Sequence, residues 1–401
     1  MKNKEFIPVL LGSDRNVYGM ALAFYEGYNI KSIALGKRDA RETLGSKLII
    51  SIKEERLEED EVFVKKLLEI KKNYEDIDLI LIACSDVYMK LIINNKSKLK
   101  NKYIIPYVDK KLMDKLVLKE QFYKTCDTYG LKYPKTEICT YDDYKKYMPS
   151  FSFPIIIKPS NSVAYWKCDF EGKKKVFICE TKEDMKRIFK GIYKSGYKDS
   201  LIIQEYIPGD DTKLRVLNAY VDSNHKVTFM ALGQILLEEK APKEIGDYGA
   251  IITTYDKKLM NKIKDFLEDI KFFGYANFDF KYDERTKEYI IFEINIRQGR
   301  SSSFTTLSGY NITKYLVDDV IYNKKRKIEY LTDKHLWNVV GKHTILKHLK
   351  DEKLKGEVKY LYKQKKASNL LFYKKDMGLS RLKNVLILYM RTIQRYNKYY
   401  K

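Results

Sequence analysis

Apolar runs the length of β-strands alternate with helical patterns along the first hundred residues. The runs are FIPVLL, SIAL, DLILIAC and YIIPY, and the helical patterns cover Val17–Gly27, Leu57–Lys72 and the segment after Ser85. Strands separated by crossover helices form parallel sheets that are buried on both faces. The pattern therefore predicts an α/β domain over residues 1–108, whose first strand ends at Gly12.

The pattern changes from Asp109 onwards. A long helix is predicted over Lys110–Tyr129, because glycine and proline stop signals follow it. Thr140 and Thr181 each precede an amphipathic stretch with an aspartate three residues further on, which predicts two N-capped helices. Two strand-like runs and a polar loop lie between them, in FPIIIKPSNSVAYWKCDFEGKKKVFIC. We expect residues 109–200 to form a small α+β lobe.

Residues 201–325 have the pattern of an antiparallel sheet with a packing helix. The strand-like runs LIIQEYI, RVLNAYVD and VTFMALGQILLEE precede a helical pattern over Lys257–Phe273 and a hairpin-like pair in ANFDFKYDERTKEYIIFEINIRQGR. The Lys-rich stretch KKRKIEY then begins a basic helical C-terminal segment, residues 326–401. The whole chain is thus predicted to combine α/β and α+β domains.

Composition narrows the class of protein. The 401 residues are enough for two to four domains, and 44% hydrophobic with 33% charged residues argues against disorder. No apolar run approaches the roughly 18–20 residues of a membrane-spanning helix, and the start lacks a signal-peptide cleavage site. Five scattered cysteines and four histidines favour reduced thiols over a disulfide or zinc framework. A cytoplasmic protein is expected, in which any metal is held by oxygen ligands.

The net charge of +23 is concentrated near the C-terminus. Residues 324–401 contain 22 Lys and Arg against six Asp and Glu. Lys, Tyr, Ile and Asn are all frequent, which indicates compositional drift, so no nucleic-acid partner is expected from charge alone. A basic amphipathic helix is predicted over Leu379–Ile393, with an apolar stripe formed by Leu379, Leu382, Leu386, Tyr389, Met390 and Ile393. It could make peripheral contact with an anionic membrane or attract a nucleotide-linked precursor, and the alternative is a helix packed on the core.

The predicted hairpin carries the most informative acidic residues. Alternate residues of a strand share a face, so Asn277 and Asp279 lie together on one strand, and Glu293 and Asn295 on the next. With a turn centred near Thr286, Asp279 lies opposite Glu293, with Cβ atoms about 4.5–5.5 Å apart. Two such carboxylates repel each other and raise one pKa, whereas a bridging divalent cation stabilises both. The pair predicts a magnesium site, with an incidental solvated hairpin face as the alternative.

Two lysines are candidates for binding phosphate. Lys115 lies near the start of the long helix, and Lys158 ends the apolar run PIIIK just before Pro159. A lysine that ends a buried strand is well placed to meet a phosphate as a point charge. Taken alone, each is better explained as an ordinary surface lysine in a chain this rich in lysine, so the surrounding motifs decide between the two. The segment SDRNVYG after Gly12 could present N–H groups to an anion at a helix start, but it lacks the GxGxxG pattern of dinucleotide sites.

The order of these motifs resembles the nucleotide site of the ATP-grasp ligases. DK before a helix and GLKYPKT, then FPIIIKPSNS, IIQEYIPGDD, NFDF and FEINIRQGR, follow one another within residues 109–310. PVLLGSDRNVYGMALAFYEGYNIKSIALG, GQILLEEKAP and EINIRQGRSSS are similar to the narrower group that includes the D-aspartate ligases of peptidoglycan cross-bridge synthesis. The resemblance implies a Rossmann-like pre-ATP-grasp domain followed by a two-lobed ATP-grasp fold, with the small lobe at 109–200 and the large lobe at 201–325.

The resemblance also implies which residues bind ATP. Lys115 and Lys158 would hold its phosphates, and Asp211 would take the ribose hydroxyls. Backbone groups of Glu205 and Ile207 in the hinge would contact adenine. The remaining expected residues are Gln204 and Tyr206 in the hinge, and Ser160, Asn161 and Ser162, which open a loop that would close over the phosphates.

The metal and catalytic residues follow from the same resemblance. Asn277 stands where D-alanine:D-alanine ligases carry an arginine, so the anion-stabilising role is open. We assign it to Arg297 and Arg300, for which structural pairing with nearby acids is the alternative. The expected ligands of two magnesium ions are Asp279, Glu293 and Asn295.

The implied reaction joins a carboxylate to an amine. The carboxylate attacks the γ-phosphate of ATP to form an acyl phosphate, and the amine then displaces phosphate. We expect an amino acid such as D-aspartate to be activated and joined to an amine of a peptidoglycan precursor peptide. Two alternatives stay open: a ligase that forms a free dipeptide or another small amide, and a catalytically idle protein that binds nucleic acid or a membrane surface.

Overall fold

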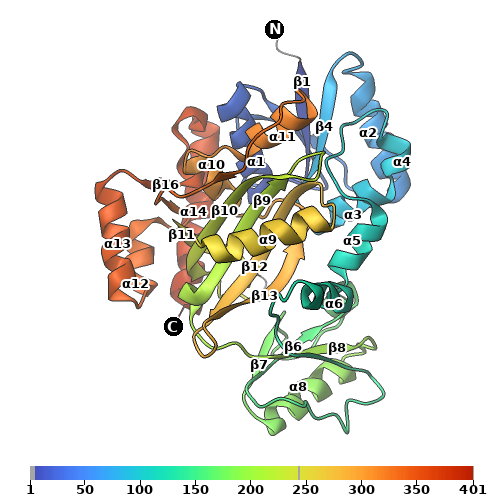
Figure 1. The fold of residues 1–401 in the computed structure, drawn as a ribbon, viewed down its shortest axis with the longest axis vertical. Helices are drawn as coiled ribbons and strands as arrows, with labels where there is room; N and C mark the ends of the chain where they lie inside the picture. The colour runs from blue at the N-terminus through green and yellow to red at the C-terminus, as the bar shows by residue number, and fades with distance from the viewer. Residues whose placement is uncertain (1–4, 243, 401) are drawn as a thin grey trace.

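Three β-sheets organise the protein, described here by a computed structural model for residues 5–242 and 244–400. Figure 1 shows the N-terminal domain at the top, the long central sheet in the middle and a small lobe at the bottom. The side chains of Glu120, Ser162 and Val163 lie outside the description. Across these described ranges, no helix combines the length and apolar character needed to cross a bilayer.

The N-terminal domain is a parallel sheet of strand order β3-β2-β1-β4, which confirms the predicted parallel arrangement. β1 is buried on both faces because Leu10 packs with α1, whereas Val9 and Leu11 pack with α2 and α3. Asp14 and Ser85 cap α1 and α3 at the carboxyl edge of this sheet. Its elements are β1 (Phe6–Leu11), α1 (Arg15–Tyr28), β2 (Ser32–Gly36), β3 (Ile49–Lys53), α2 (Asp60–Lys72), β4 (Asp78–Ala83), α3 (Asp86–Asn94) and α4 (Lys96–Leu99).

The helix predicted over Lys110–Tyr129 is two helices. Leu118 has an extended backbone, with φ −76° and ψ 112°, and separates α5 (Lys110–Val117) from α6 (Lys119–Thr128). The single-helix prediction was therefore wrong. The break matters for the site, because it places Lys119 at the start of a new helix.

The small lobe is an antiparallel sheet of order β5-β8-β6-β7. The strand run that begins at Leu201 therefore belongs to this lobe and not, as predicted, to the sheet of residues 201–325. Thr181 caps α8 as predicted. The helix predicted after Thr140 was wrong: the Thr140 hydroxyl accepts a hydrogen bond from the Asp143 N–H at 3.3 Å, but the chain there forms turns. The elements are β5 (Thr136–Cys139), β6 (Ile155–Pro159), α7 (Ser162–Lys167), β7 (Phe177–Cys179), α8 (Lys182–Lys194) and β8 (Leu201–Glu205).

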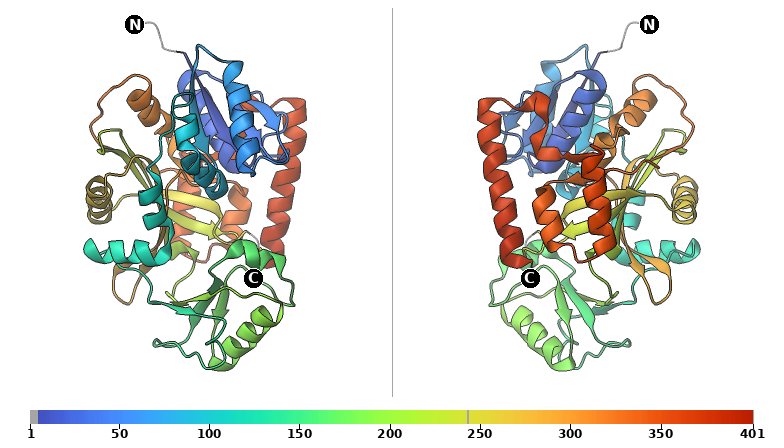
Figure 2. Two further views of the ribbon diagram at one scale, coloured as in Figure 1. Left: turned by 90° about the vertical axis from the view of Figure 1, so that its right-hand side faces the viewer. Right: turned by 90° about the vertical axis from the view of Figure 1, so that its left-hand side faces the viewer.

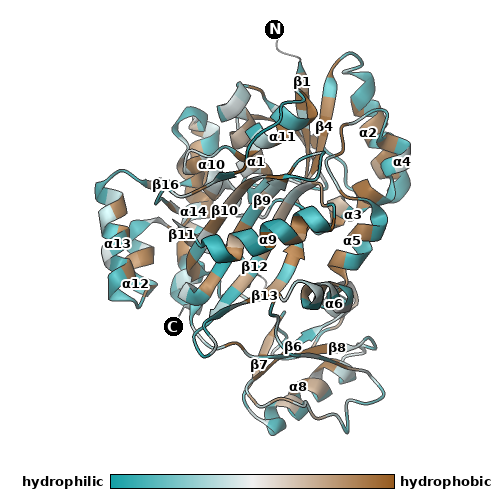
Figure 3. Cartoon of the chain, viewed as in Figure 1, coloured by the Kyte–Doolittle hydropathy of each residue, from teal (hydrophilic) through white to brown (hydrophobic). Residues whose placement is uncertain are grey.

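The large lobe contains the central sheet, in which β13-β12-β9-β10-β11 are antiparallel neighbours. The predicted packing helix is α9, whose outward face is hydrophilic where it covers the apolar strands (Figures 1 and 3). The elements are η1 (Asp211–Lys213), β9 (Leu214–Val221), β10 (Val227–Glu238), β11 (Tyr248–Thr254), α9 (Lys257–Asp269), β12 (Gly274–Asp283), β13 (Glu288–Asn295), α10 (Ser303–Leu307) and α11 (Ile312–Val320).

The large lobe also contacts the N-terminal domain directly. Gly274, with φ +98°, pairs with Tyr107 in an isolated bridge, and a Cβ at this position would collide with the Pro106 carbonyl. Only glycine fits both the backbone conformation and this close approach. The start of β12 is therefore fixed against the first domain.

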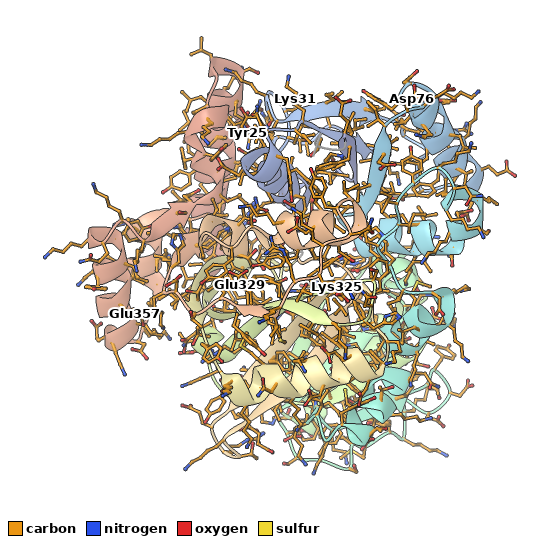
Figure 4. All side chains as sticks on the ribbon, turned by 45° about the horizontal axis from the view of Figure 1, so that its top comes forward. Tyr25, Lys31, Asp76, Lys325, Glu329 and Glu357 are labelled. Carbon is orange, nitrogen blue, oxygen red and sulfur yellow. The ribbon has the colours of Figure 1, made fainter. Side chains whose placement is uncertain are left out.

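The C-terminal segment is built into the large lobe. It adds β14 beside β10, β15 beside β11, and β16 at the sheet edge, so it is not purely helical. Figure 4 shows the connection that carries Lys325 and Glu329 near the middle of the molecule, while Glu357 lies at its periphery. The elements are β14 (Glu329–Tyr330), β15 (Leu336–Asn338), α12 (Gly341–His348), α13 (Glu352–Lys363), β16 (Ala367–Asn369), η2 (Leu370–Phe372), η3 (Lys374–Asp376) and α14 (Leu379–Tyr399).

The last helix, α14, runs along the side of the molecule from the N-terminal domain towards the small lobe (Figure 2). Its most buried side chains are not the predicted apolar stripe. Leu379, Leu386 and Met390 are 90%, 44% and 59% exposed. The buried residues are Arg381, Val385, Thr392 and Tyr396. The helix thus packs on the core, as the alternative interpretation held, through a different face from the one that hydrophobicity indicated.

Arg381 anchors the first turn of α14 to the N-terminal domain. The side chains of Arg381 and Asp376 are both fully buried, with Nε and Oδ2 3.6 Å apart. Arg381 also donates to the carbonyl of Glu42 at 2.6 Å, and Asp376 accepts from the Ser46 hydroxyl at 2.7 Å and the Lys47 N–H at 2.6 Å. A buried pair is stable only with such additional hydrogen bonds.

Candidate active site

A cavity of about 1480 Å³ lies where the two lobes and the N-terminal domain meet. The small lobe contributes Lys158 and Ser160, and the large lobe contributes Asp279 and Glu293. The first domain supplies residues after β1 and β4, at the carboxyl edge of its parallel sheet, where open α/β folds bind ligands. The C-terminal segment closes one wall with residues from α12 and the end of α14.

The acidic pair has the predicted register. Asp279 of β12 is paired with Glu293 of β13, and Asn277 with Asn295, around a turn at residues 284–287. A β-bulge follows Asp279 in this ladder, so that Phe292 has no partner of its own and also lines the cleft. The hairpin therefore brings two carboxylates and two amides to one wall of the cavity.

Hydrogen bonds orient the amides of this group. Asn295 donates from Nδ2 to Asn277 Oδ1 at 3.1 Å and to Asp279 Oδ2 at 3.4 Å, and Asn277 donates to Asn218 at 3.1 Å. Because the Asn295 nitrogen is used by its neighbours, its Oδ1 is the atom left to ligate a cation. Two carboxylates and one amide oxygen suit a hard divalent cation such as Mg²⁺. The residues present thus fit the expected metal.

Burial and the neighbouring Glu293 carboxylate raise the pKa of Asp279 from 3.8 to about 7. The Tyr248 hydroxyl donates to Asp279 at 2.7 Å and opposes this shift. The repulsion inferred from the hairpin pattern is therefore present. A divalent cation between the two carboxylates would offset it.

Two ammonium groups face the acidic pair. The Lys119 Nζ lies 3.6 Å from Glu293 Oε2, and Lys158 lies beside Lys119. Burial alone would lower the pKa of Lys119, but Glu293 and Tyr123 outweigh it and raise that pKa. Burial and the Lys119 charge lower the pKa of Lys158. Two adjacent cations at a cleft wall form a site for a polyanion, because a bound phosphate removes their mutual repulsion.

The structure corrects the position of the first lysine. Lys115 is exposed on α5, where its neighbour Lys110 pairs with Asp114, and it is absent from the described cleft lining. Lys119, one turn further along the chain, lines the cleft instead. The error follows from the break at Leu118, which turns α6 and its first residue towards the cavity. Lys158 is at the cleft wall as expected.

The hinge residues Gln204, Glu205, Tyr206 and Ile207 all line the cleft. Gln204 is buried and donates to the Thr136 hydroxyl at 2.7 Å. The Lys281 ammonium lies 5.4 Å from the centre of the Tyr206 ring. The hinge is thus held in place at one wall of the cavity, and its contact with adenine stays a prediction.

Asp211 lies in the cleft but already has partners. Its carboxylate accepts hydrogen bonds from the Glu238 N–H at 2.8 Å, from Lys240, and from the Tyr400 hydroxyl at 2.5 Å. Tyr400 comes from the end of the C-terminal segment. The sequence motifs did not indicate this contact, because Tyr400 follows Asp211 by 189 residues along the chain.

The predicted phosphate-covering loop is only partly placed in the cleft. Ser160 lines it, with its hydroxyl donating to the Ser200 carbonyl at 2.7 Å. Asn161 instead caps α7 by accepting from the Ala164 N–H at 3.1 Å, and it is missing from the described cleft lining. The side chain of Ser162 lies outside the described residues.

Both predicted arginines line the cleft, and both are ion-paired. Arg297 forms a two-pronged pair with Asp86 of the N-terminal domain, at 2.7 and 2.9 Å, and donates to the Gln298 carbonyl at 3.0 Å. Arg300 pairs with Asp247 and lies 3.3 Å from Asp14. The pairing alternative thus holds for both side chains. Of five guanidinium N–H donors, Arg297 uses three in these described contacts, which leaves two.

No protein-family model matches the sequence. The D-aspartate ligase of Enterococcus faecium (strain Aus0004) is 40% identical over 413 residues, which cover 100% of this chain and 98% of that protein. Among solved structures, the ADP complex of N5-carboxyaminoimidazole ribonucleotide synthetase has a TM-score of 0.60 at 12% identity, covering 90% of this chain and 88% of that one. The L-amino acid ligase from Bacillus licheniformis has a TM-score of 0.53 at 12% identity, covering 79% and 70%.

The two-lobed fold and its cleft define an ATP-grasp protein, an ATP-dependent carboxylate–amine ligase. The identity along the full length is more specific, and the chain belongs to the D-aspartate ligase family. This membership stands against the catalytically idle binder that the sequence alone left open.

The raised pKa of Asp279 predicts an unusual pH dependence of stability. Between pH 4 and 7 the folded, metal-free protein holds a proton that the unfolded chain has lost, so the free energy of unfolding falls as the pH rises. The variant Asp279→Asn cannot ionise and should exceed the wild type in stability at pH 8 by roughly 1–3 kcal/mol. Urea denaturation of both metal-free proteins at pH 5 and pH 8 measures this difference.

Added Mg²⁺ serves as the control for this experiment. It should stabilise the wild type at pH 8 and have less effect on Asp279→Asn. Equal pH dependence in the two proteins would show that Asp279 ionises normally.

Proposed function

We propose that this ligase activates a carboxylate of D-aspartate as an acyl phosphate and joins it to an amine of a peptidoglycan precursor peptide in the cytoplasm. The main observation in support of ligase chemistry is that Asp279 and Glu293 face Lys119 and Lys158 in one cleft. The substrate assignment is supported by the name of the full-length relative. The alternative is a ligase that forms a free dipeptide or another small amide.

ATP would lie between the lobes, with its phosphates at the lysine pair and its base against the hinge. Lys119 and Lys158 neutralise phosphate charge, and Asp279, Glu293 and the Asn295 oxygen would hold two Mg²⁺ ions. Bound there, Mg²⁺ supplies charge stabilisation for phosphoryl transfer. Ser160 and its loop would exclude water, because an acyl phosphate exposed to water hydrolyses.

The amino acid would bind on the N-terminal side of the cleft. Arg15, at the start of α1, lines the cleft, and its buried Nε lacks a hydrogen-bond partner within the described structure. Aspartate has two carboxylates, of which one reacts, and a guanidinium binds the other well. We assign Arg15 to the unreacted carboxylate and Arg297 to the charge that develops on the reacting one.

Substitutions test the proposed phosphate-binding role of Lys119 and Lys158. Lys119→Ala should lower kcat/KM for ATP by roughly 100-fold, because one of two phosphate-binding charges is lost. Lys158→Ala should raise KM for ATP steeply, and Glu293→Gln should remove turnover while leaving the fold nearly intact. Phosphate release measured over a range of ATP concentrations gives these constants.

Lys115→Ala is the matched control, since it removes the same side chain one turn away on an exposed surface. It should stay within about twofold of the wild type, as is usual for isolated surface positions. Equal losses of kcat/KM for ATP in Lys115→Ala and Lys119→Ala would contradict the proposed phosphate site.

The acceptor can be identified by product mass. With ATP, Mg²⁺ and D-aspartate, a UDP-linked muropeptide should gain the mass of one aspartyl residue. If the enzyme instead forms a dipeptide without the muropeptide, the alternative function is correct. Mass spectrometry of complete and singly depleted reactions separates the two outcomes.

The same assay tests Arg15. The wild type should prefer D-aspartate to D-alanine and to β-alanine, each of which lacks one of the two carboxylates. Arg15→Met should weaken that preference by roughly 10-fold or more, the usual effect of leaving a buried charge without its partner. An unchanged preference would remove Arg15 from the substrate site.

We further propose that the outward face of α14 makes peripheral contact with anionic membranes. Leu379, Leu386 and Met390 are exposed, and Lys383 and Arg391 lie exposed on the same helix, which contains no acidic residue. Apolar side chains flanked by positive charge suit an anionic lipid surface.

Flotation with liposomes tests this contact. Vesicles that contain anionic lipid should recover more wild-type protein than neutral vesicles do, and Leu386→Gln with Met390→Gln should lower the recovery several-fold. These exposed substitutions leave the buried face of α14 intact. Equal recovery of both proteins would end the membrane proposal.

A further inference from the structure

The end of α14 reaches into the nucleotide side of the cleft. Tyr399 and Tyr400 line the cleft, as does His348 at the end of α12. The ring of Tyr400 lies 4.9 Å from that of His348 and 5.6 Å from that of Tyr396, between centroids. Arg395, one turn earlier, forms an ion pair of 3.1 Å with the buried Glu239 at the end of β10. The last turn of the helix is thus held at the cavity wall by stacking and by charge.

The Tyr400 hydroxyl saturates one oxygen of Asp211. It donates to Oδ2 at 2.5 Å, and the same oxygen accepts from the Glu238 N–H at 2.8 Å. The other oxygen, Oδ1, accepts from Lys240. Burial and the Asp211 charge raise the pKa of Tyr400, so its hydroxyl stays protonated and remains a donor. Each carboxylate oxygen offers about two acceptor sites, so one site on Oδ1 is left.

We propose that the Tyr400 hydroxyl competes with a ribose hydroxyl for Asp211, and that ATP displaces it. The inference rests on the proposed role of Asp211 as the ribose acceptor. A ribose that donates from two adjacent hydroxyls needs two acceptor sites, but Asp211 has one free. Binding of ATP therefore breaks the Tyr400 hydrogen bond and releases this tyrosine from the cleft wall.

The displacement is local because α14 is anchored elsewhere. Arg381 fixes its first turn to the N-terminal domain through Asp376 and the Glu42 carbonyl. Release of Tyr400 leaves these contacts in place. The last turn of α14 thus responds to nucleotide while the rest of the helix stays docked.

Affinity measurements test the competition. Tyr400→Phe keeps the ring and removes the hydroxyl, so the Kd for ATP should fall roughly 3- to 10-fold, as expected when one competing hydrogen bond is lost. The Kd for inorganic tripolyphosphate, which has no ribose, should not change. Tyr360→Phe, an exposed tyrosine of α13 whose hydroxyl makes no described hydrogen bond, is the matched control and should keep wild-type affinity. Isothermal titration calorimetry of each protein with each ligand gives these constants.

Hydrogen exchange of the intact wild-type protein provides a second measurement. ATP should increase amide exchange at residues 396–400, and tripolyphosphate should not. An ATP affinity that is equal or weaker in Tyr400→Phe, or exchange that ATP leaves unchanged, would overturn the inference while the ligase assignment stands. Failure of the wild type to bind either ATP or tripolyphosphate would overturn the inference and the proposed function together.

Discussion

Two carboxylates that are forced to face each other are the constraint on which the cleft depends. The antiparallel register of β12 and β13 places Asp279 against Glu293, and neither side chain can leave without a change in the hairpin. Their repulsion, seen in the raised pKa of Asp279, destabilises this wall of the cleft and favours the binding of a cation there. Lys119 offsets part of that charge from the opposite side. The fold thus holds an unfavourable arrangement that a metal–polyphosphate complex would relieve.

Ion pairs across the cleft connect the parts of the molecule that must stay aligned. Arg297, which follows β13, forms an ion pair with Asp86 of the N-terminal domain. Arg300 contacts Asp14 at the start of α1. Both contacts therefore fix the N-terminal domain relative to the acidic hairpin. An arginine paired in this way is pre-oriented, so its remaining donors cost little entropy when they bind an anion. Structural pairing and anion binding are compatible roles.

The sequence predicted the parts of the site that depend on strands. The alternation of side chains along a strand and the position of a polar turn determine which residues of a short hairpin face each other. The Asp279–Glu293 pair could therefore be found without coordinates. Lys158 was predictable because it ends a buried strand. Lys119 was missed because Leu118 breaks the helix without a proline or glycine to signal it. The buried face of α14 was missed because Arg381 is buried by an ion pair with Asp376, which hydrophobic periodicity cannot detect.

The position of α14 explains how a strongly basic segment forms part of an anion-binding enzyme. Arg381 and Arg395 are each neutralised by a buried carboxylate, so their charges are structural and contribute little to the field in the cleft. The cations of this helix that form no described ion pair, Lys383, Arg391 and Lys398, are all exposed. The inward side ends in tyrosines, which contact the cleft through rings and hydroxyl groups. The helix therefore lines the cleft with two tyrosines, while its two buried arginines are neutralised by carboxylates and its remaining cations are exposed.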